Sequence, residues 1–110
     1  MDVLQKRRND VIILLCRGRL DANTSPEFEK ELFDLIRKGE SKFVLDFQDL
    51  DYISSAGLRV LLKAAKTLKS SEGQISFSSL KDYVREVFEI SGFDTIFRLH
   101  ATQEEALNDF

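Results

Sequence analysis

Residues 51–62, DYISSAGLRVLL, change character in their middle. The β-rich apolar run KFVLDF, residues 42–47, precedes this stretch, and leucines at helical spacing follow it. The change predicts the end of a strand and then the start of a helix. Two adjacent serines, Ser54 and Ser55, stand at this boundary, although one hydroxyl is enough to cap a helix. The stretch therefore raises the question of what the second hydroxyl does.

Strand and helix patterns alternate on both sides of this stretch. Strands are expected over residues 3–8, 11–17, 43–47, 74–77 and 95–99, with a hairpin turn at Asn9-Asp10. Helices are expected after Pro26, after Ser55, over the apolar stripe from Leu80 to Phe88, and after the capping box Thr102-Gln103-Glu104-Glu105. The order β-β-α-β-α-β-α-β-α predicts one α/β domain over residues 1–110, with a mixed, mostly parallel sheet of about five strands and about four helices.

The expected topology also brings distant residues together. The segments 18–25 and 48–54 are expected as loops that leave two parallel strands at the same carboxyl edge of the sheet, where open α/β sheets usually place their sites. Asp21 should therefore lie near the serine pair. In the first of these loops Ser25, which precedes Pro26, is expected to cap the first helix, with Glu27 at the positive end of its dipole.

Composition and charge exclude several classes of protein. The formal net charge of the chain is −3 and its basic residues are scattered, which argues against a nucleic-acid-binding protein. No apolar run approaches the roughly 20 residues of a membrane span, and the first residues, MDVLQK, do not resemble a signal peptide. These features predict a cytoplasmic protein that does not insert into a membrane.

Neither a metal site nor a catalytic site is indicated. Cys16 lies inside an apolar run and is expected to be a small buried hydrophobe, and His100 is expected to have a surface or capping role. Neither residue has partners at the spacing of a zinc site, and no phosphate-binding loop is present. Asp46 lies on a strand, but the acidic pair of a phospho-aspartate receiver is missing. We therefore expect no cofactor, no metal and no catalytic residue.

Three interpretations of the serine pair remain. One serine caps the helix and Gly57 is kept for close packing. Alternatively, a serine accepts a regulatory phosphate, which a helix N-terminus tolerates and which adds about −1.5 to −2 charge. A serine nucleophile would need a base and an oxyanion hole, but the chain has a single histidine, His100, near its C-terminus and no GxSxG motif. The residues alone do not decide between a cap and a phosphate acceptor.

Four motifs in order resemble the STAS domain of bacterial anti-sigma factor antagonists. They are GRLD at residues 18–21, LDF at 45–47, YISSAGL at 52–58 and SGF at 91–93. The resemblance implies a binding protein, not an enzyme, that takes part in partner switching and transcription regulation. An unphosphorylated member captures an anti-sigma factor serine kinase and so frees a sigma factor. The kinase inactivates it by phosphorylating a loop serine, and a PP2C-type phosphatase restores it.

Aligned on Gly57-Leu58, the phosphorylated serine of the family corresponds to Ser55. Partner-binding residues are expected on the two loops and the start of the second helix, at Asp21, Asn23, Thr24, Ser54, Ser55, Ala56, Gly57 and Arg59. Asp21 is expected either to contact the partner directly or to anchor its loop.

Two residues depart from the usual family loop. Ser54 replaces an aspartate, which leaves Ser54 as a second candidate acceptor. Arg59 replaces a common glycine and either pairs with a phosphate or a partner's acid or is simply solvated. The missing acid also leaves an alternative open, a STAS adaptor subunit of a transporter or signalling assembly that is not phosphorylated.

Overall fold

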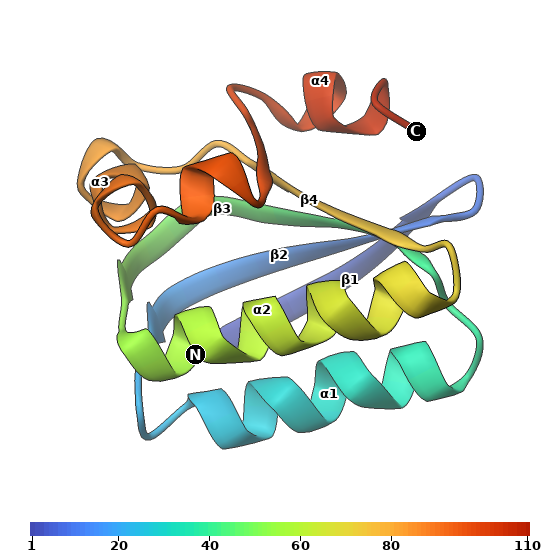
Figure 1. The fold of residues 1–110 in the computed structure, drawn as a ribbon, viewed down its shortest axis with the longest axis horizontal. Helices are drawn as coiled ribbons and strands as arrows, with labels where there is room; N and C mark the ends of the chain where they lie inside the picture. Colours follow the sequence, from blue (N-terminus) through green and yellow to red (C-terminus); the bar gives the residue numbers. More distant parts are fainter.

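Strands and helices alternate along the chain in the predicted order (Figure 1). In the computed structural model, which describes residues 1–110, the elements are β1 (Asp2–Arg8), β2 (Val11–Leu20), α1 (Ser25–Arg37), β3 (Lys42–Ile53), α2 (Ser55–Ser70), β4 (Gln74–Ser78), α3 (Asp82–Ile90), the 3₁₀ helix η1 (Phe93–Thr95), β5 (Arg98–His100) and α4 (Gln103–Leu107). The predicted fold class, a single α/β domain with five strands and four α-helices, is confirmed.

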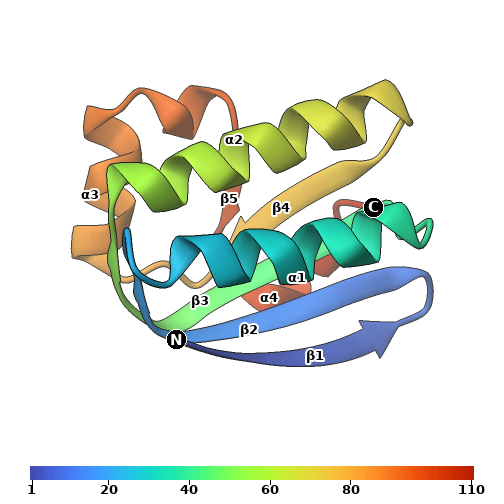
Figure 2. The same cartoon turned by 90° about the horizontal axis from the view of Figure 1, so that it is seen from below.

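The five strands form one sheet in the order β1-β2-β3-β4-β5. The hairpin strand β1 is antiparallel to β2, and the other three pairs are parallel. Helices α1 and α2 lie side by side under one face of the sheet, and α4 lies against the opposite face (Figures 1 and 2). Because the crossover helices α1 and α2 follow parallel strands, the segments after β2 and β3 reach the same edge of the sheet.

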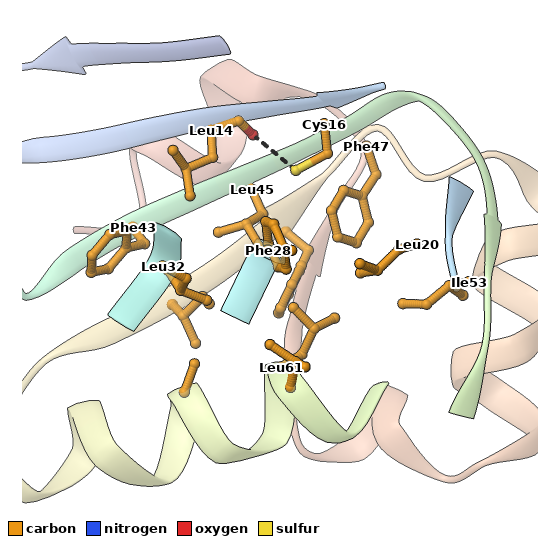
Figure 3. Close-up of a cluster of buried hydrophobic side chains, with 14 of the residues drawn as sticks. Leu14, Cys16, Leu20, Phe28, Leu32, Phe43, Leu45, Phe47, Ile53 and Leu61 are labelled. Carbon is orange, nitrogen blue, oxygen red and sulfur yellow. Dashed lines mark hydrogen bonds between the residues drawn. The ribbon is translucent and has the colours of Figure 1, made fainter. Parts of the chain in front are cut away.

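The main core lies between the sheet and helices α1 and α2. Alternate residues of β2 and β3 point toward these helices and are nearly or fully buried: Ile12, Leu14, Cys16, Phe43, Leu45 and Phe47. They meet Phe28 and Leu32 of α1 and Leu61 of α2 (Figure 3). Full burial of each large apolar side chain stabilises the fold by about 1.5–3 kcal/mol.

Cys16 belongs to this core, as predicted. Its side chain is 1% exposed and its Sγ lies 3.9 Å from the carbonyl oxygen of Leu14, a weak contact that Figure 3 marks with a dashed line. Burial raises the pKa of the thiol far above its ordinary value. Because the thiolate is the reactive form, Cys16 is an inert packing residue.

A smaller cluster holds α4 against the other face of the sheet. Ala106 packs with Val11, Ile13 and Val44. Beside it, the Gln103 side-chain amide donates to the buried carboxylate of Asp46 over 2.8 Å. Thr102 caps α4 as predicted, since its Oγ1 accepts a hydrogen bond from the backbone of Glu105 at 3.1 Å. His100 is half-buried, and its Nε2 lies 3.1 Å from Oδ2 of Asp109.

Of the segments expected as loops, residues 48–53 and residues 18–20 are strand, while residues 21–24 form a turn. Strand β2 continues through Gly18 to Leu20, and β3 continues from Gln48 to Ile53. The two extensions pair with each other, with register shifts that interrupt the ladder near Arg17 and Gly18. These bulges break the regular alternation of apolar and polar residues, so the sequence pattern ends before the strands do. The true connection after β3 is therefore very short.

Two further expectations were wrong in detail. Ser25 is the first residue of α1 rather than its cap; the chain is already helical at Thr24, and the Ser25 backbone N–H donates to the carbonyl of Asp21 at 2.9 Å. The expected strand over residues 95–99 begins only at Arg98. Thr95 belongs to η1, and Ile96 and Phe97 form a turn, where Phe97 packs edge to face on Phe93 with ring centres 5.6 Å apart.

Candidate functional site

The structure gives the two serines different roles. Ser54 is the N-cap of α2, with extended backbone angles and a side-chain oxygen that accepts a hydrogen bond from the Gly57 backbone N–H at 3.3 Å. Ser55 is the first residue of the helix and is exposed. No hydrogen bond joins the Ser55 hydroxyl to the rest of the chain. Ser54 alone therefore caps α2, and the hydroxyl of Ser55 is exposed to solvent without a hydrogen-bond partner in the chain.

Gly57 holds the first turn of α2 against the end of β2. A Cβ atom at this position would lie 2.8 Å from Cγ of Leu20, 3.0 Å from Cγ1 of Ile53 and 3.0 Å from the carbonyl oxygen of Leu20. The same carbonyl accepts a hydrogen bond from the Ser54 backbone at 2.9 Å. The close-packing role expected for Gly57 is confirmed, and the contact places the serine pair directly beside the end of β2.

Asp21 follows Leu20 and organises the turn into α1. Its Oδ1 accepts hydrogen bonds from the backbone N–H groups of Asn23 and Thr24 at 2.9 and 3.1 Å. The hydroxyl of Thr24 donates to the carbonyl of Arg19 at 2.8 Å. The Thr24 N–H contributes most to holding the pKa of the Asp21 carboxyl below its ordinary value, with smaller contributions from Asn23 and Arg19. The Asp21 carboxylate is therefore charged and anchors its own loop.

Arg19 and Tyr52 extend this edge and were not among the expected partner-binding residues, although both lie in the family motifs. The Arg19 guanidinium lies 4.1 Å from the centre of the Tyr52 ring, and its Nε lies 3.6 Å from Oδ2 of Asp21. The two residues are register partners on β2 and β3. Their pairing was missed because both segments were expected to be loops. Tyr52 is 40% exposed, and its contact with Arg19 connects its ring with the Asp21 loop.

An open groove of about 420 Å³ separates the first turns of α1 and α2. Its wall contains Ala22, Ser25, Pro26, Glu29, Ala56, Arg59, Val60 and Lys63. Lys63 and Glu29 form an ion pair across the groove at 2.8 Å. Arg59 is exposed and has no ion pair or hydrogen bond with the rest of the chain. The groove thus combines apolar walls with one unpaired cation.

The expected site residues gather at one edge of the domain, but they are not equally available. Asp21, Asn23 and Thr24 lie on the turn before α1. This turn lies next to the first turn of α2 (Figure 2). On α2, Ser55 and Arg59 are exposed, Ser54 and Ala56 are half-buried, and Gly57 is buried. Gly57 therefore positions the others and offers little surface of its own.

Comparison with known proteins assigns the family. The profile of the STAS domain matches residues 3–106. The chain belongs to the STAS domain family. All of this STAS domain aligns, at 41% identity over 110 residues, with 95% of a Bordetella bronchiseptica protein that carries the name anti-sigma factor antagonist BtrV.

Solved structures agree with this assignment. A crystal structure named as an anti-sigma factor antagonist from Thermotoga maritima superimposes with a TM-score of 0.93 at 29% identity, over 97% of this STAS domain and 92% of that chain. The Bacillus protein SpoIIAA in its phosphorylated form shares the fold, with a TM-score of 0.77 at 20% identity and 98% of each chain covered.

None of the helices of this STAS domain has both the length and the apolar character that a membrane crossing requires. No group of three or more histidine, cysteine or acidic side chains is arranged to hold a metal ion.

Proposed function

We propose that this STAS domain is an anti-sigma factor antagonist, a cytoplasmic protein that captures an anti-sigma factor serine kinase while Ser55 is unmodified. Capture frees a sigma factor. The kinase transfers the γ-phosphoryl group of ATP to the Ser55 hydroxyl, with ADP as the leaving product, and the complex then separates. A PP2C-type phosphatase restores the free hydroxyl.

The exposed, unpartnered hydroxyl of Ser55 is the observation that carries this proposal. The fold makes no use of this hydroxyl, because Ser54 supplies the cap of α2. Ser55 lies at the edge that also carries the Asp21 turn, so a protein that docks there would contact both. The names of the relatives support the same function, and SpoIIAA has been solved in a phosphorylated form.

The proposed docking surface consists of the Asp21 turn, the exposed residues of the first turns of α2, and the Arg19–Tyr52 contact beside them. The hydrogen bonds of Asp21 hold its turn in one conformation before a partner arrives. A preformed surface loses less conformational entropy on binding. Asp21 therefore acts chiefly as a loop anchor, and its substitution would weaken binding by disordering the turn.

Phosphorylation at Ser55 would block binding without refolding the domain. The phosphate adds about −1.5 to −2 charge at an exposed helix N-terminus, which favours a negative charge by about 0.3–1 kcal/mol. At an interface the same group must lose its water. One unpaired charge buried there costs several kcal/mol, enough to lower the affinity by about a hundredfold or more.

The proposal is tested with kinase-fold candidates from the same genome, purified and measured by calorimetry. The unmodified protein and Ser55→Ala should bind the cognate kinase with similar affinity, whereas protein carrying phosphoserine at position 55 should not bind. With ATP, the kinase should label the unmodified protein and Ser54→Ala but not Ser55→Ala. Circular dichroism and melting of the phosphorylated and unmodified forms should nearly coincide.

Two results would contradict the proposal. Undiminished labelling of Ser55→Ala would move the acceptor to Ser54. A pull-down from the native cell that returned only transporter subunits, with no phosphate on the bait, would favour the adaptor function instead.

A further inference from the structure

Arg59 has no structural task that accounts for its place in the groove between α1 and α2. The groove wall carries three charged side chains, Glu29, Arg59 and Lys63. Glu29 and Lys63 neutralise each other over 2.8 Å, and Lys63 also lies 5.2 Å from the centre of the Phe33 ring. Arg59 alone has neither an acidic partner nor an aromatic contact. Its guanidinium is therefore free to bind an anion.

The geometry of α2 directs this guanidinium toward Ser55. The two residues are four positions apart within one helix, so their Cβ atoms are about 5–6 Å apart on the same face. Helical side chains lean toward the N-terminus of the helix, and a long side chain covers the turn that precedes its own position. Arg59 thus leans over the turn that begins with Ser55. Ala56, which lines the groove with Arg59, is the next residue after Ser55.

We propose that Arg59 binds the phosphate of phosphorylated Ser55 within the same chain. The ligand is a phosphomonoester dianion, and the guanidinium fork suits it because two parallel N–H groups donate to two phosphate oxygens. This inference rests on the proposed phosphorylation of Ser55. The bound phosphate then lies against the groove wall, which stabilises the inactive form and slows its dephosphorylation.

The other charged groups of the groove and of the Asp21 turn are already paired, which leaves the phosphate to Arg59. On α1, Glu29 is bound to Lys63. On the turn before α1, the Asp21 carboxylate accepts backbone hydrogen bonds and faces Arg19 at 3.6 Å. Lys63, two turns after Ser55 on α2, adds attraction at longer range. The groove as a whole, with two cations and one anion, therefore carries a net positive charge in a chain whose net charge is −3.

The test needs no kinase, because phosphoserine can be placed at position 55 during translation by an expanded genetic code. The second pKa of the phosphate, ordinarily about 6, is measured by ³¹P NMR titration in the otherwise unchanged protein and in Arg59→Gln, Arg59→Lys and Lys66→Gln. Gln is a good helix former and Arg59 is exposed, so Arg59→Gln should fold. Lys66 is an exposed cation on the same helix, three turns from Ser55, and serves as the matched control.

Arg59 should lower this pKa by about 0.2–0.4 unit, because an opposite charge four residues along the helix favours the dianion over the monoanion. Arg59→Gln should lose this shift, Arg59→Lys should keep part of it, and Lys66→Gln should keep it in full. The Nε–Hε resonance of Arg59 should also move when Ser55 is phosphorylated. The same pKa in the unchanged protein and in Arg59→Gln would overturn the proposal, since the helix dipole is present in both.

The outcome is independent of whether a kinase partner exists. Failure of the unmodified protein to bind any kinase would contradict the proposed function and leave the titration result as it stands. Kinase binding together with an unchanged phosphate pKa would contradict the role of Arg59 alone.

Discussion

Substitution of the two adjacent serines separates the cap from the free hydroxyl. Ser54→Ala removes the acceptor for the Gly57 N–H, whose hydrogen bond is long at 3.3 Å. Loss of an N-cap typically costs about 1 kcal/mol, and the length of this bond places the expected loss at about 0.5–1 kcal/mol. Ser55→Ala removes no hydrogen bond and adds the best helix former, so the free energy of unfolding should stay the same or rise by up to about 0.5 kcal/mol.

These differences are large enough to measure. For a chain of this length, 1 kcal/mol corresponds to about 4 °C in melting temperature. Ser54→Ala should therefore melt about 2–4 °C below the unchanged protein, and Ser55→Ala at or slightly above it. The measurement is urea and thermal unfolding of both variants, followed by far-ultraviolet circular dichroism.

Ser54→Asp is the matched control. Aspartate caps helices as well as serine does and adds a charge that the helix dipole favours, so this variant should equal or exceed the unchanged protein in stability. The assignment of roles would be refuted if Ser55→Ala lost as much stability as Ser54→Ala, or if Ser54→Asp were less stable than Ser54→Ala.

Two further substitutions test the positioning of the site. Gly57→Ala should lower the free energy of unfolding by about 0–2 kcal/mol, because the added Cβ meets Leu20 at 2.8 Å, an overpacking cost of about 1–3 kcal/mol, while the gain in helix propensity is about 1 kcal/mol. A clearly stabilised variant in urea unfolding would show that this contact is not tight. Asp21→Asn should melt below the unchanged protein at pH 6. The difference in melting temperature should shrink as the pH falls through the folded-state pKa of Asp21, which lies below the unfolded value of about 3.9. A difference in melting temperature that does not depend on pH would exclude the charge of Asp21 as its cause.

The order of the elements and the burial of their apolar faces followed from the sequence, because these depend on local pattern. The pattern before Ser55 consists of β-branched and aromatic runs, and the pattern after it consists of leucines at helical spacing. Each pattern repeats over several residues, so the prediction does not depend on any single position. Cys16 could be assigned to the core in the same way. The Thr102 cap of the last helix was also confirmed, because its hydrogen bond lies within a few residues, but the Glu105 side chain accepts from the backbone N–H of Ala101 instead of completing the capping box at Thr102.

The ends of the strands could not be predicted, because a neighbouring strand determines them. Residues 48–53 contain several polar residues and read as a loop, yet they pair with the end of β2 across a bulged ladder. Likewise, Ser25 has a suitable residue type for a cap, but the carboxylate of Asp21 organises that turn and starts the helix earlier. In both cases a contact between separate segments overrides the local preference.

The sequence by itself placed Asp21 and the serine pair at one edge of a parallel sheet, because parallel crossovers bring the ends of successive strands together. Only the tertiary structure decided which of the two serines caps α2. That choice depends on the contact of Gly57 with Leu20 and on the direction of one N–H group, which set Ser54 facing inward as the cap and Ser55 outward with a free hydroxyl. The family resemblance pointed to Ser55 as the acceptor, but the chemistry of two identical adjacent side chains does not say which of them caps the helix, so that assignment depends on packing.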